Sequence, residues 1–236
     1  MSYIDGFVAA VLQKNKQAYL DHAREALSLF KDHGATRMVE NWGDDVPEGK
    51  VTDFHRSVQK KDGEAVLFGW IEWPSKDVRD AGMTALMADA RMKTLKMPFD
   101  GQRMIFGGFS PIVEKGSAKG ASYTDGFVVP VPAANRDAYI RVASNAASVF
   151  EEYGALRVVE GWGDDVPNGK VTDFRRAVDA RRRDDCLQLD RMAVEEGAGR
   201  SLAQADGRPA HAAHKDNMPF DGKRMIYGGF TTILEA

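Results

Sequence analysis

The sequence predicts an α+β fold in which two tandem ferredoxin-like (βαββαβ) domains pack sheet to sheet as a barrel-like pair. Three observations predict it. Long motifs recur once along the 236 residues, each repeat alternates between strand and helix patterns, and helices can cover only one face of each sheet. The bare face of one sheet must also be buried, and the second copy is the nearest partner.

The repeat is read from three motif pairs. "SYIDGFV" returns as "SYTDGFV", "NWGDDVPEGKVTDF" as "GWGDDVPNGKVTDF", and "MPFDGQRMIFGGF" as "MPFDGKRMIYGGF". A period this long indicates two copies of a whole domain rather than a solenoid. We therefore predict copy one at residues 1–115, a small polar linker at 116–121 and copy two at 122–236.

The first half of each copy predicts a strand, a helix and a second strand. Residues 3–11 alternate and contain Phe and Val, which favours a strand. Asn15 is expected to cap a helix that carries apolar residues at helical spacing and stops at Gly34. Residues 35–42 predict the second strand, and "GDDVPEG" predicts a turn.

The second half of each copy completes the unit. "EAVLFGWIEW", residues 64–73, is the strongest strand signal in the chain. Ser75 is expected to cap a helix that reaches about Met92, and residues 103–113 form the last strand. The order strand, helix, strand, strand, helix, strand is that of the ferredoxin-like split unit.

These motifs carry a resemblance to a known family. "WGDDVPxGKVTDF", "WIEWPSK", "MPFDGxRMIxGGF" and "YxDGFV" resemble the YbaA-like family of short bacterial proteins of unknown function. The resemblance implies a ferredoxin-like fold of the dimeric α/β-barrel group. It covers copy one entirely and copy two apart from about residues 181–214. Family members are usually one copy long, so the duplication is a departure.

Copy two loses its pattern over residues 183–214. Reverse-translating "QLDRMAVE" with permitted codons and reading one base later gives S-W-I-E-W-P-S-K, against "GWIEWPSK" in copy one. We interpret the segment as a frameshift that begins near Arg183 and is restored near His214, either genomic or a sequencing error. The alternative is a divergent insertion. Resequencing the gene distinguishes them.

Because of this divergent segment, we expect copy two to lack its third strand and its second helix. The third strand is an inner strand of the sheet. The segment contains Gly197, Gly199, Gly207 and Pro209 and little apolar periodicity, so it is predicted to pack poorly. Two short runs, residues 186–194 and 201–205, are the parts that can still form structure. We expect an exposed sheet edge that invites aggregation.

Composition limits the partners. A net charge of −3 without a cluster of Lys and Arg argues against nucleic acid. The chain has no apolar run of membrane-spanning length and no signal-peptide pattern at its start, so we expect no membrane association and a cytoplasmic location. One cysteine, Cys186, excludes an internal disulfide framework. The two copies are expected to form an intramolecular pseudo-dimer, or copy one to form a homodimer.

Strand alternation predicts which copy-one side chains face the barrel. Leu67, Ile71, Ile4 and Val8 are assigned to the helix side. The opposite faces then offer an aromatic-walled cavity with carboxylates and a guanidinium, suited to a small, partly apolar molecule. The cavity candidates are Tyr3, Asp5, Phe7, Glu40, Trp42, Phe68, Trp70, Glu72 and Arg103, with Asp125, Glu160, Trp162 and Arg224 in copy two. In the alternative interpretation they are interface core, with Arg103 pairing Glu40 or Glu72.

The turn motif supplies further polar candidates: Asp44, Asp45, Lys50 and Asp53. They can form an anion or metal site or a loop over the cavity, or simply a capped turn with solvated charges. The alternation of oxygen ligands that calcium prefers is absent, and the histidines show no metal-ligand spacing, so we expect neither a metal nor a cofactor.

Two functions follow. The first is a protein that binds a small molecule in the barrel cavity, either as a binding protein or as a cofactor-independent enzyme, because a carboxylate kept among aromatic rings can act as a general base. The second is a non-catalytic assembly or stress-related protein whose aromatic and acidic residues only hold the copies together. The fold does not decide between them.

Overall fold

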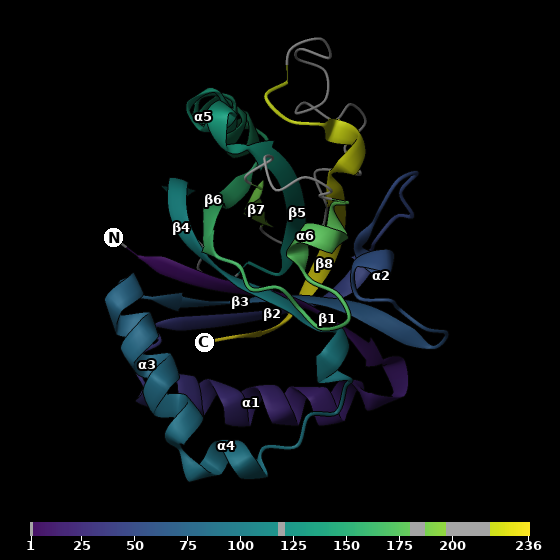
Figure 1. The fold of residues 1–236 in the computed structure, drawn as a ribbon, viewed down its shortest axis with the longest axis vertical. Helices are drawn as coiled ribbons and strands as arrows, with labels where there is room; N and C mark the ends of the chain where they lie inside the picture. The colour runs from purple at the N-terminus through teal and green to yellow at the C-terminus, as the bar shows by residue number, and fades with distance from the viewer. Residues whose placement is uncertain (1, 118–120, 180–186, 197–217) are drawn as a thin grey trace.

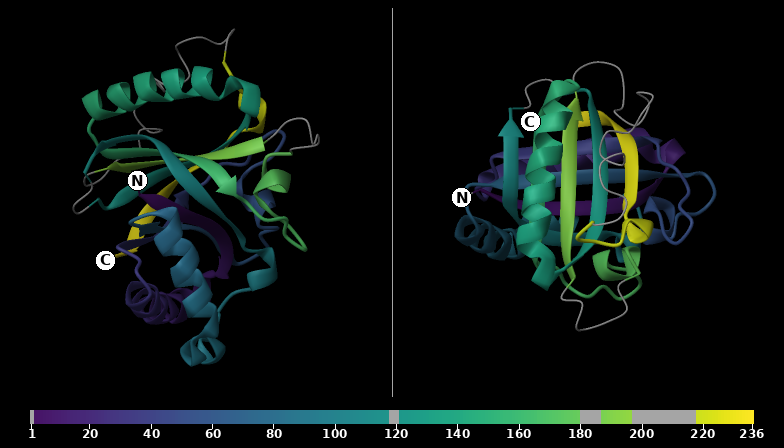
Figure 2. Two further views of the ribbon diagram at one scale, coloured as in Figure 1. Left: turned by 60° about the vertical axis from the view of Figure 1, so that its left-hand side comes forward. Right: turned by 90° about the horizontal axis from the view of Figure 1, so that it is seen from above.

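The computed structural model describes residues 2–117, 121–179, 187–196 and 218–236. Within them, eight antiparallel strands form one closed barrel in the order β1-β3-β2-β8-β5-β7-β6-β4. Figure 1 shows the barrel with helices outside it on opposite sides, and Figure 2 shows the same layers from two further directions. The predicted α+β fold of two ferredoxin-like units is confirmed.

Both copies follow the predicted element order where they are described. Copy one comprises β1 (Tyr3–Leu12), α1 (Lys16–Asp32), β2 (Arg37–Asp45), α2 (Phe54–Ser57), β3 (Glu64–Trp73), α3 (Lys76–Ala88), α4 (Ala90–Thr94) and β4 (Ile105–Gly116). Copy two comprises β5 (Tyr123–Pro132), α5 (Arg136–Glu152), β6 (Ala155–Asp165), α6 (Phe174–Ala177), β7 (Leu187–Glu196) and β8 (Ile226–Glu235). Short 3₁₀ turns precede α1, β4, α5 and β8.

Local signals set several of these boundaries. Ser75 caps α3 as expected, since its hydroxyl accepts a hydrogen bond from the Val78 amide at 3.2 Å. Gly34 follows α1 with φ of +104°, a conformation that glycine adopts without a Cβ clash. Asn15 occupies the N-cap position of α1 as expected, but its side chain makes no capping hydrogen bond. Its side chain donates instead to the Pro98 carbonyl at 3.2 Å and fastens the start of α1 to the loop before β4.

The two sheets are joined at both edges. Residues 105–109 of β4 pair with β1, and residues 108–116 pair with β6 of the other copy. In the same way, β8 pairs with β5 and then with β2. Each last strand therefore bridges the halves, which closes the barrel within one chain. Of the two arrangements expected, the structure shows the intramolecular pseudo-dimer.

The predicted loss of an inner strand in copy two is wrong. Strand β7 lies between β5 and β6 and pairs with both, so the closed barrel leaves no free sheet edge there. The physical reason is visible in the sequence: the Gly and Pro residues that argued against order all lie after Glu196. Residues 187–196 contain no Gly or Pro, and any such segment can supply a full ladder of backbone hydrogen bonds.

The register of β7 shows what the segment has replaced. Gly126 pairs with Ala193 as Gly6 pairs with Trp70. By the same register, Arg191 stands at the position of Phe68 and Glu195 at that of Glu72. Cys186, the run 201–205 and the histidines at 211 and 214 lie outside the described residues.

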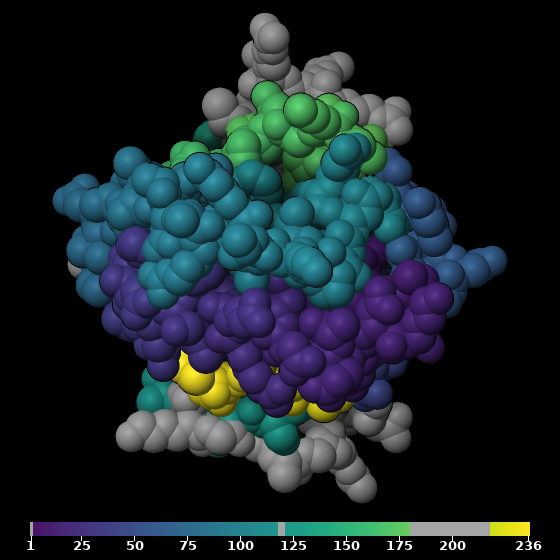
Figure 3. Space-filling view, turned by 90° about the horizontal axis from the view of Figure 1, so that it is seen from below, coloured from purple at the N-terminus to yellow at the C-terminus, as the bar shows by residue number. Residues whose placement is uncertain are grey.

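Three apolar layers result. The barrel interior takes residues from both copies, including Val8, Phe68, Phe109, Val128 and Phe230. The second layer lies between the sheet of copy one and α1, and the third lies between that of copy two and α5. Figure 3 shows the outer surface on the copy-one side, with residues from purple to teal and the C-terminal residues in yellow at one margin.

Candidate functional site

The interior-facing candidates form a packed aromatic core. Phe68, Trp70 and Glu72 project into the barrel, as predicted. The Phe68 ring stacks on Phe230 with centroids 5.2 Å apart and an interplanar angle of 23°, and Phe54 meets both rings edge-on. Phe68 and Phe230 belong to different copies. These aromatic side chains therefore fill the interface, as the alternative interpretation proposed.

Glu72 belongs to an ion network that joins the halves. Its carboxylate accepts hydrogen bonds from Arg157 at 2.6 Å and Arg37 at 2.7 Å, and from the Trp70 indole at 3.0 Å. Arg157 also binds Glu114 at 2.8 Å. Burial alone would raise the pKa of Glu72, but the two guanidinium groups lower it to about 2.

The faces predicted for the first two strands are wrong. Tyr3, Phe7 and Trp42 lie in the layer beneath α1, whereas Ile4, Val8 and Val39 face the barrel interior. Alternation fixes which residues share a face but not which face is inside. Because these strands are buried on both faces, side-chain hydrophobicity could not decide the direction.

Asp5 and Glu40 are also on the helix side. Asp5 accepts hydrogen bonds from the Trp73 indole at 2.9 Å and from the Arg79 guanidinium of α3. Burial raises its pKa, and the bonds from Arg79 oppose that shift. Glu40 accepts a hydrogen bond from a tyrosine of α1. Asp125, the counterpart of Asp5 on β5, is buried.

Arg103 and Arg224 bind local carboxylates. Arg103 lies in the 3₁₀ turn before β4 and pairs with Glu64 at 2.6 Å and Asp100 at 2.9 Å. The pairing predicted for it with Glu40 or Glu72 is therefore wrong. Arg224 pairs with Asp221 at 3.0 Å in the equivalent turn of copy two. Both arginines fasten turns at the start of a last strand.

The turn motif is a structural element at the end of the barrel. Asp53 caps α2 by accepting from the Arg56 and Gly49 amides at 2.7 and 3.1 Å. Asp44 accepts a hydrogen bond from Tyr123 of the other copy, and the equivalent bond joins Tyr3 to Asp164. Asp45 and Lys50 are exposed. Across the described ranges, no cluster of three metal-ligating side chains occurs.

The two helix layers each contain a buried Tyr–Glu pair. The Tyr19 hydroxyl of α1 donates to Glu40 Oε2 at 2.8 Å, and the Tyr139 hydroxyl of α5 donates to Glu160 Oε2 at 2.8 Å. Sequence reasoning named both glutamates and missed both tyrosines. The available signal was a Tyr retained on the apolar face of the same helix in both copies, since a buried Tyr hydroxyl usually requires a partner.

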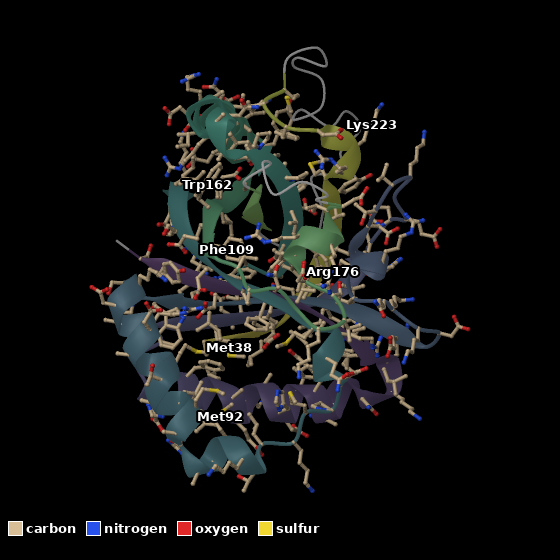
Figure 4. The ribbon with its side chains drawn as sticks, viewed as in Figure 1. Met38, Met92, Phe109, Trp162, Arg176 and Lys223 are labelled. Atoms are coloured by element: carbon tan, nitrogen blue, oxygen red, sulfur yellow. The ribbon has the colours of Figure 1, made fainter. Side chains whose placement is uncertain are left out.

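Aromatic rings and one cation surround each pair. In copy one, Phe99 lies 5.8 Å and Trp42 6.5 Å from the Tyr19 ring. In copy two, Phe220 lies 5.7 Å from the Tyr139 ring, and Arg136 lies over Trp162 at 5.3 Å. Figure 4 shows Trp162 on the copy-two sheet, on the side of α5, and Phe109 within the barrel.

Copy two leaves two polar atoms of this layer unsatisfied. In the part of the chain that the structure describes, three buried side-chain atoms lack a hydrogen-bond partner: Glu160 Oε1, Trp162 Nε1 and His22 Nδ1. Glu160 is 0% exposed and Trp162 is 3% exposed. Both stand on the α5 face of β6, two residues apart. Among the described residues, an acceptor and a donor without partners therefore lie on one buried face of β6.

The environment of Glu160 changes its acidity. Complete burial raises its pKa to about 7, and the hydrogen bond from Tyr139 opposes part of that shift. Near neutral pH this carboxyl is therefore divided between its acid and base forms. His22 differs: burial lowers its pKa, which favours the neutral ring.

We expect Glu160 to make the stability of the protein depend on pH. Because its folded pKa lies above 4.5, its contribution to stability is full below pH 4.5 and is lost as the pH rises to about 7. At 1.36 kcal/mol per unit, that loss is roughly 3 kcal/mol. Chemical denaturation should show it in the native protein and not in Glu160→Gln. The control Glu151→Gln, at a side chain 40% exposed, should keep the native profile.

The fold and its two helix layers define a class of protein. It is a duplicated ferredoxin-like protein that builds within one chain the barrel that dimeric α/β-barrel proteins build from two subunits. The chain belongs to the family described as Protein of unknown function (DUF1428), whose model matches residues 2–101 and 122–222. In the described part of the chain, no helix is both long and apolar enough to cross a membrane.

Comparison with known proteins supports the duplication. The "Uncharacterized protein YbaA" of Escherichia coli (strain K12) is 53% identical over 117 residues, which cover 49% of this chain and 100% of that protein. The same protein of Shigella flexneri matches equally well. A complete relative therefore corresponds to one half of this chain, and the YbaA-like resemblance is confirmed.

Solved structures share the fold at low sequence identity. A putative monooxygenase from Fusobacterium nucleatum has a TM-score of 0.57 at 9% identity and covers 99% of this chain and 93% of its own. An anthrone oxidase-like protein has a TM-score of 0.54 at 12% identity and covers 100% and 92%. A putative monooxygenase from Lactobacillus acidophilus has a TM-score of 0.52 at 10% identity and covers 100% and 96%.

Proposed function

We propose that this protein binds a small, partly apolar molecule between α5 and β6 of copy two. The observation that carries the proposal is that Glu160 Oε1 and Trp162 Nε1, on one buried face of β6, have no partner among the described residues. A bound molecule that accepts a hydrogen bond from the indole N–H and presents a hydrogen atom to the carboxylate oxygen would contact both. This places the site in a helix layer and not in the barrel interior expected from the sequence.

The energetic argument is direct. A buried donor or acceptor without a partner costs about 1–3 kcal/mol, so native proteins keep few of them. Two such atoms on neighbouring same-face positions indicate a common cause. The rings of Tyr139 and Phe220 supply apolar contact surface, which suits a ligand that is apolar apart from one polar group.

The solved structures of similar fold are named as putative monooxygenases and an anthrone oxidase-like protein, and those names speak for a small-molecule site in those proteins. At about a tenth sequence identity they share the architecture, and one architecture serves many chemistries. For this chain the proposal rests on Glu160 and Trp162. The boundaries of the copies at residues 115 and 122 and the frameshift interpretation of residues 183–214 stay predictions.

A second candidate is a purely structural role. It is favoured by the interior aromatic residues, because Phe68 and Phe230 from different copies stack on each other. Substituting Trp70 and Glu72 should then weaken folding without changing any ligand response. Both candidates treat the residues of the barrel interior as structural. They differ only in whether the helix layer of copy two binds a small molecule.

The indole N–H signals test the binding proposal. The chain has four tryptophans, and the indoles of Trp70 and Trp73 already donate to carboxylates. The indole of Trp162 has no partner in the part of the chain that the structure describes. We expect a panel of benzamide, 2-tetralone and phenol to contain a compound that shifts the Trp162 signal in ¹H–¹⁵N spectra.

The Trp162→Phe variant identifies the indole N–H signal of Trp162, because it lacks that one of the four signals. The proposal predicts a shift at Trp162 with the signals of Trp70 and Trp73 unmoved. A panel that moves none of the four, or moves only Trp70, would count against a site in this layer.

A further inference from the structure

We infer that Glu160 transfers a proton to and from an enolisable carbonyl compound whose oxygen is held by the Trp162 indole N–H. This inference rests on the proposed function, since the compound must first bind between α5 and β6. It adds a reaction class, proton abstraction next to a carbonyl group, and a substrate class, neutral ketones with an apolar body.

The first step is the orientation of the carboxylate. The Tyr139 hydroxyl holds Oε2 at 2.8 Å, so the oxygen left for another molecule is Oε1. Tyr139 projects from α5 and Glu160 from β6, and Glu160 is fully buried, which limits the positions the carboxyl can take. A base fixed in this way has one reactive atom at a defined place.

The second step is the placement of the donor. Trp162 lies two residues after Glu160 on the same face of β6. At a strand rise of 3.3 Å per residue, their Cα atoms are about 7 Å apart. Within the described ranges its N–H has no hydrogen-bond partner, and the residue is only 3% exposed. A carbonyl oxygen that accepts this N–H brings the adjacent carbon toward Glu160 Oε1. An N–H in a dry site stabilises developing oxyanion charge more strongly than water does.

The chemistry balances without an oxidant or a cofactor. The C–H bond next to the carbonyl breaks, an O–H bond forms at Oε1, and the electron pair forms the C=C bond of an enolate. The negative charge moves to the carbonyl oxygen beside Trp162. Returning the proton to the same carbon gives isotope exchange, and returning it to another atom gives a tautomer. With a pKa near 7, Glu160 can serve as both acceptor and donor at neutral pH.

Isotope exchange provides the test. We would incubate the full chain in D₂O with 2-tetralone, phenylacetone or acetylacetone and follow loss of the α-proton signals by ¹H NMR. We expect exchange at least 100-fold faster than buffer for one or more of the ketones. Glu160→Gln should remove the enhancement, and Trp162→Phe should reduce it at least tenfold. The control Glu151→Gln on the outer side of α5 should exchange like the native protein.

The same samples distinguish the failures. A ketone that shifts the Trp162 signal but exchanges at the buffer rate overturns the proton-transfer inference and leaves the binding proposal standing. Enhanced exchange that survives in Glu160→Gln also overturns it. Three ketones that neither shift the signal nor exchange faster overturn the proton-transfer inference, and the binding proposal falls with it if benzamide and phenol also leave the Trp162 signal unmoved. If Glu160→Gln does not fold, the exchange rate of the native protein must rise with a single ionisation near pH 7, and a flat profile contradicts the inference.

Discussion

Replacing Arg157 with Met is expected to destabilise the protein by about 3–5 kcal/mol. Its guanidinium binds Glu72 at 2.6 Å and Glu114 at 2.8 Å, and its side chain is 9% exposed. Removing it leaves Glu72, whose side chain is only 13% exposed, with Arg37 as its one guanidinium partner among the described residues. Because Glu72 belongs to copy one and Arg157 to copy two, the change should weaken both halves together. Urea denaturation measures it.

The matched control is the same substitution in an exposed pair. Arg24 binds Asp21 at 3.2 Å with both side chains more than half exposed. Surface pairs of this kind contribute at most about 1 kcal/mol, so Arg24→Met should lie close to the native protein. Equal losses for the two variants would show that the network around Glu72 does not join the copies.

The second large effect is expected from Phe230→Ala, with a loss of about 3–5 kcal/mol. Phe230 is fully buried, stacks on Phe68 at 5.2 Å and meets Phe54 edge-on at 5.4 Å. The truncation leaves a void at the centre of the barrel, between the copies. Calorimetry should show one transition at lower temperature, since neither sheet can bury its inner face alone.

Phe106→Ala is the control for that variant. Phe106 lies on β4 and is half exposed, so the same loss of a ring should have a small effect. Two separate transitions in the Phe230→Ala protein would contradict a shared interior, because they would show that each copy keeps its own core.

The sequence allowed the fold to be predicted because the repeat and the element order are local properties. Ser75 and Gly34 mark helix ends through interactions a few residues long. That residues 187–196 form a strand could not be predicted from such local signals. Their strand is held by backbone pairing to β5 and β6, and side-chain periodicity is a poor guide where neighbours on both sides supply the hydrogen bonds.

The candidate site was predicted in part. Glu160 and Trp162 were named because they alternate on one strand face, and the structure brings them together. They face α5 and not the barrel, since apolar strands buried on both faces give no signal for direction. Tyr139 was missed because a tyrosine on an apolar helix face resembles ordinary core until its hydroxyl partner is known.

The most direct test of the account is an intermolecular NOE between a bound ketone and the tryptophan indole N–H groups. The helix-layer site predicts NOEs from 2-tetralone protons to the indole N–H of Trp162, beneath α5. NOEs to the indole N–H of Trp70, which lies inside the barrel, would contradict it and return the ligand to the interior.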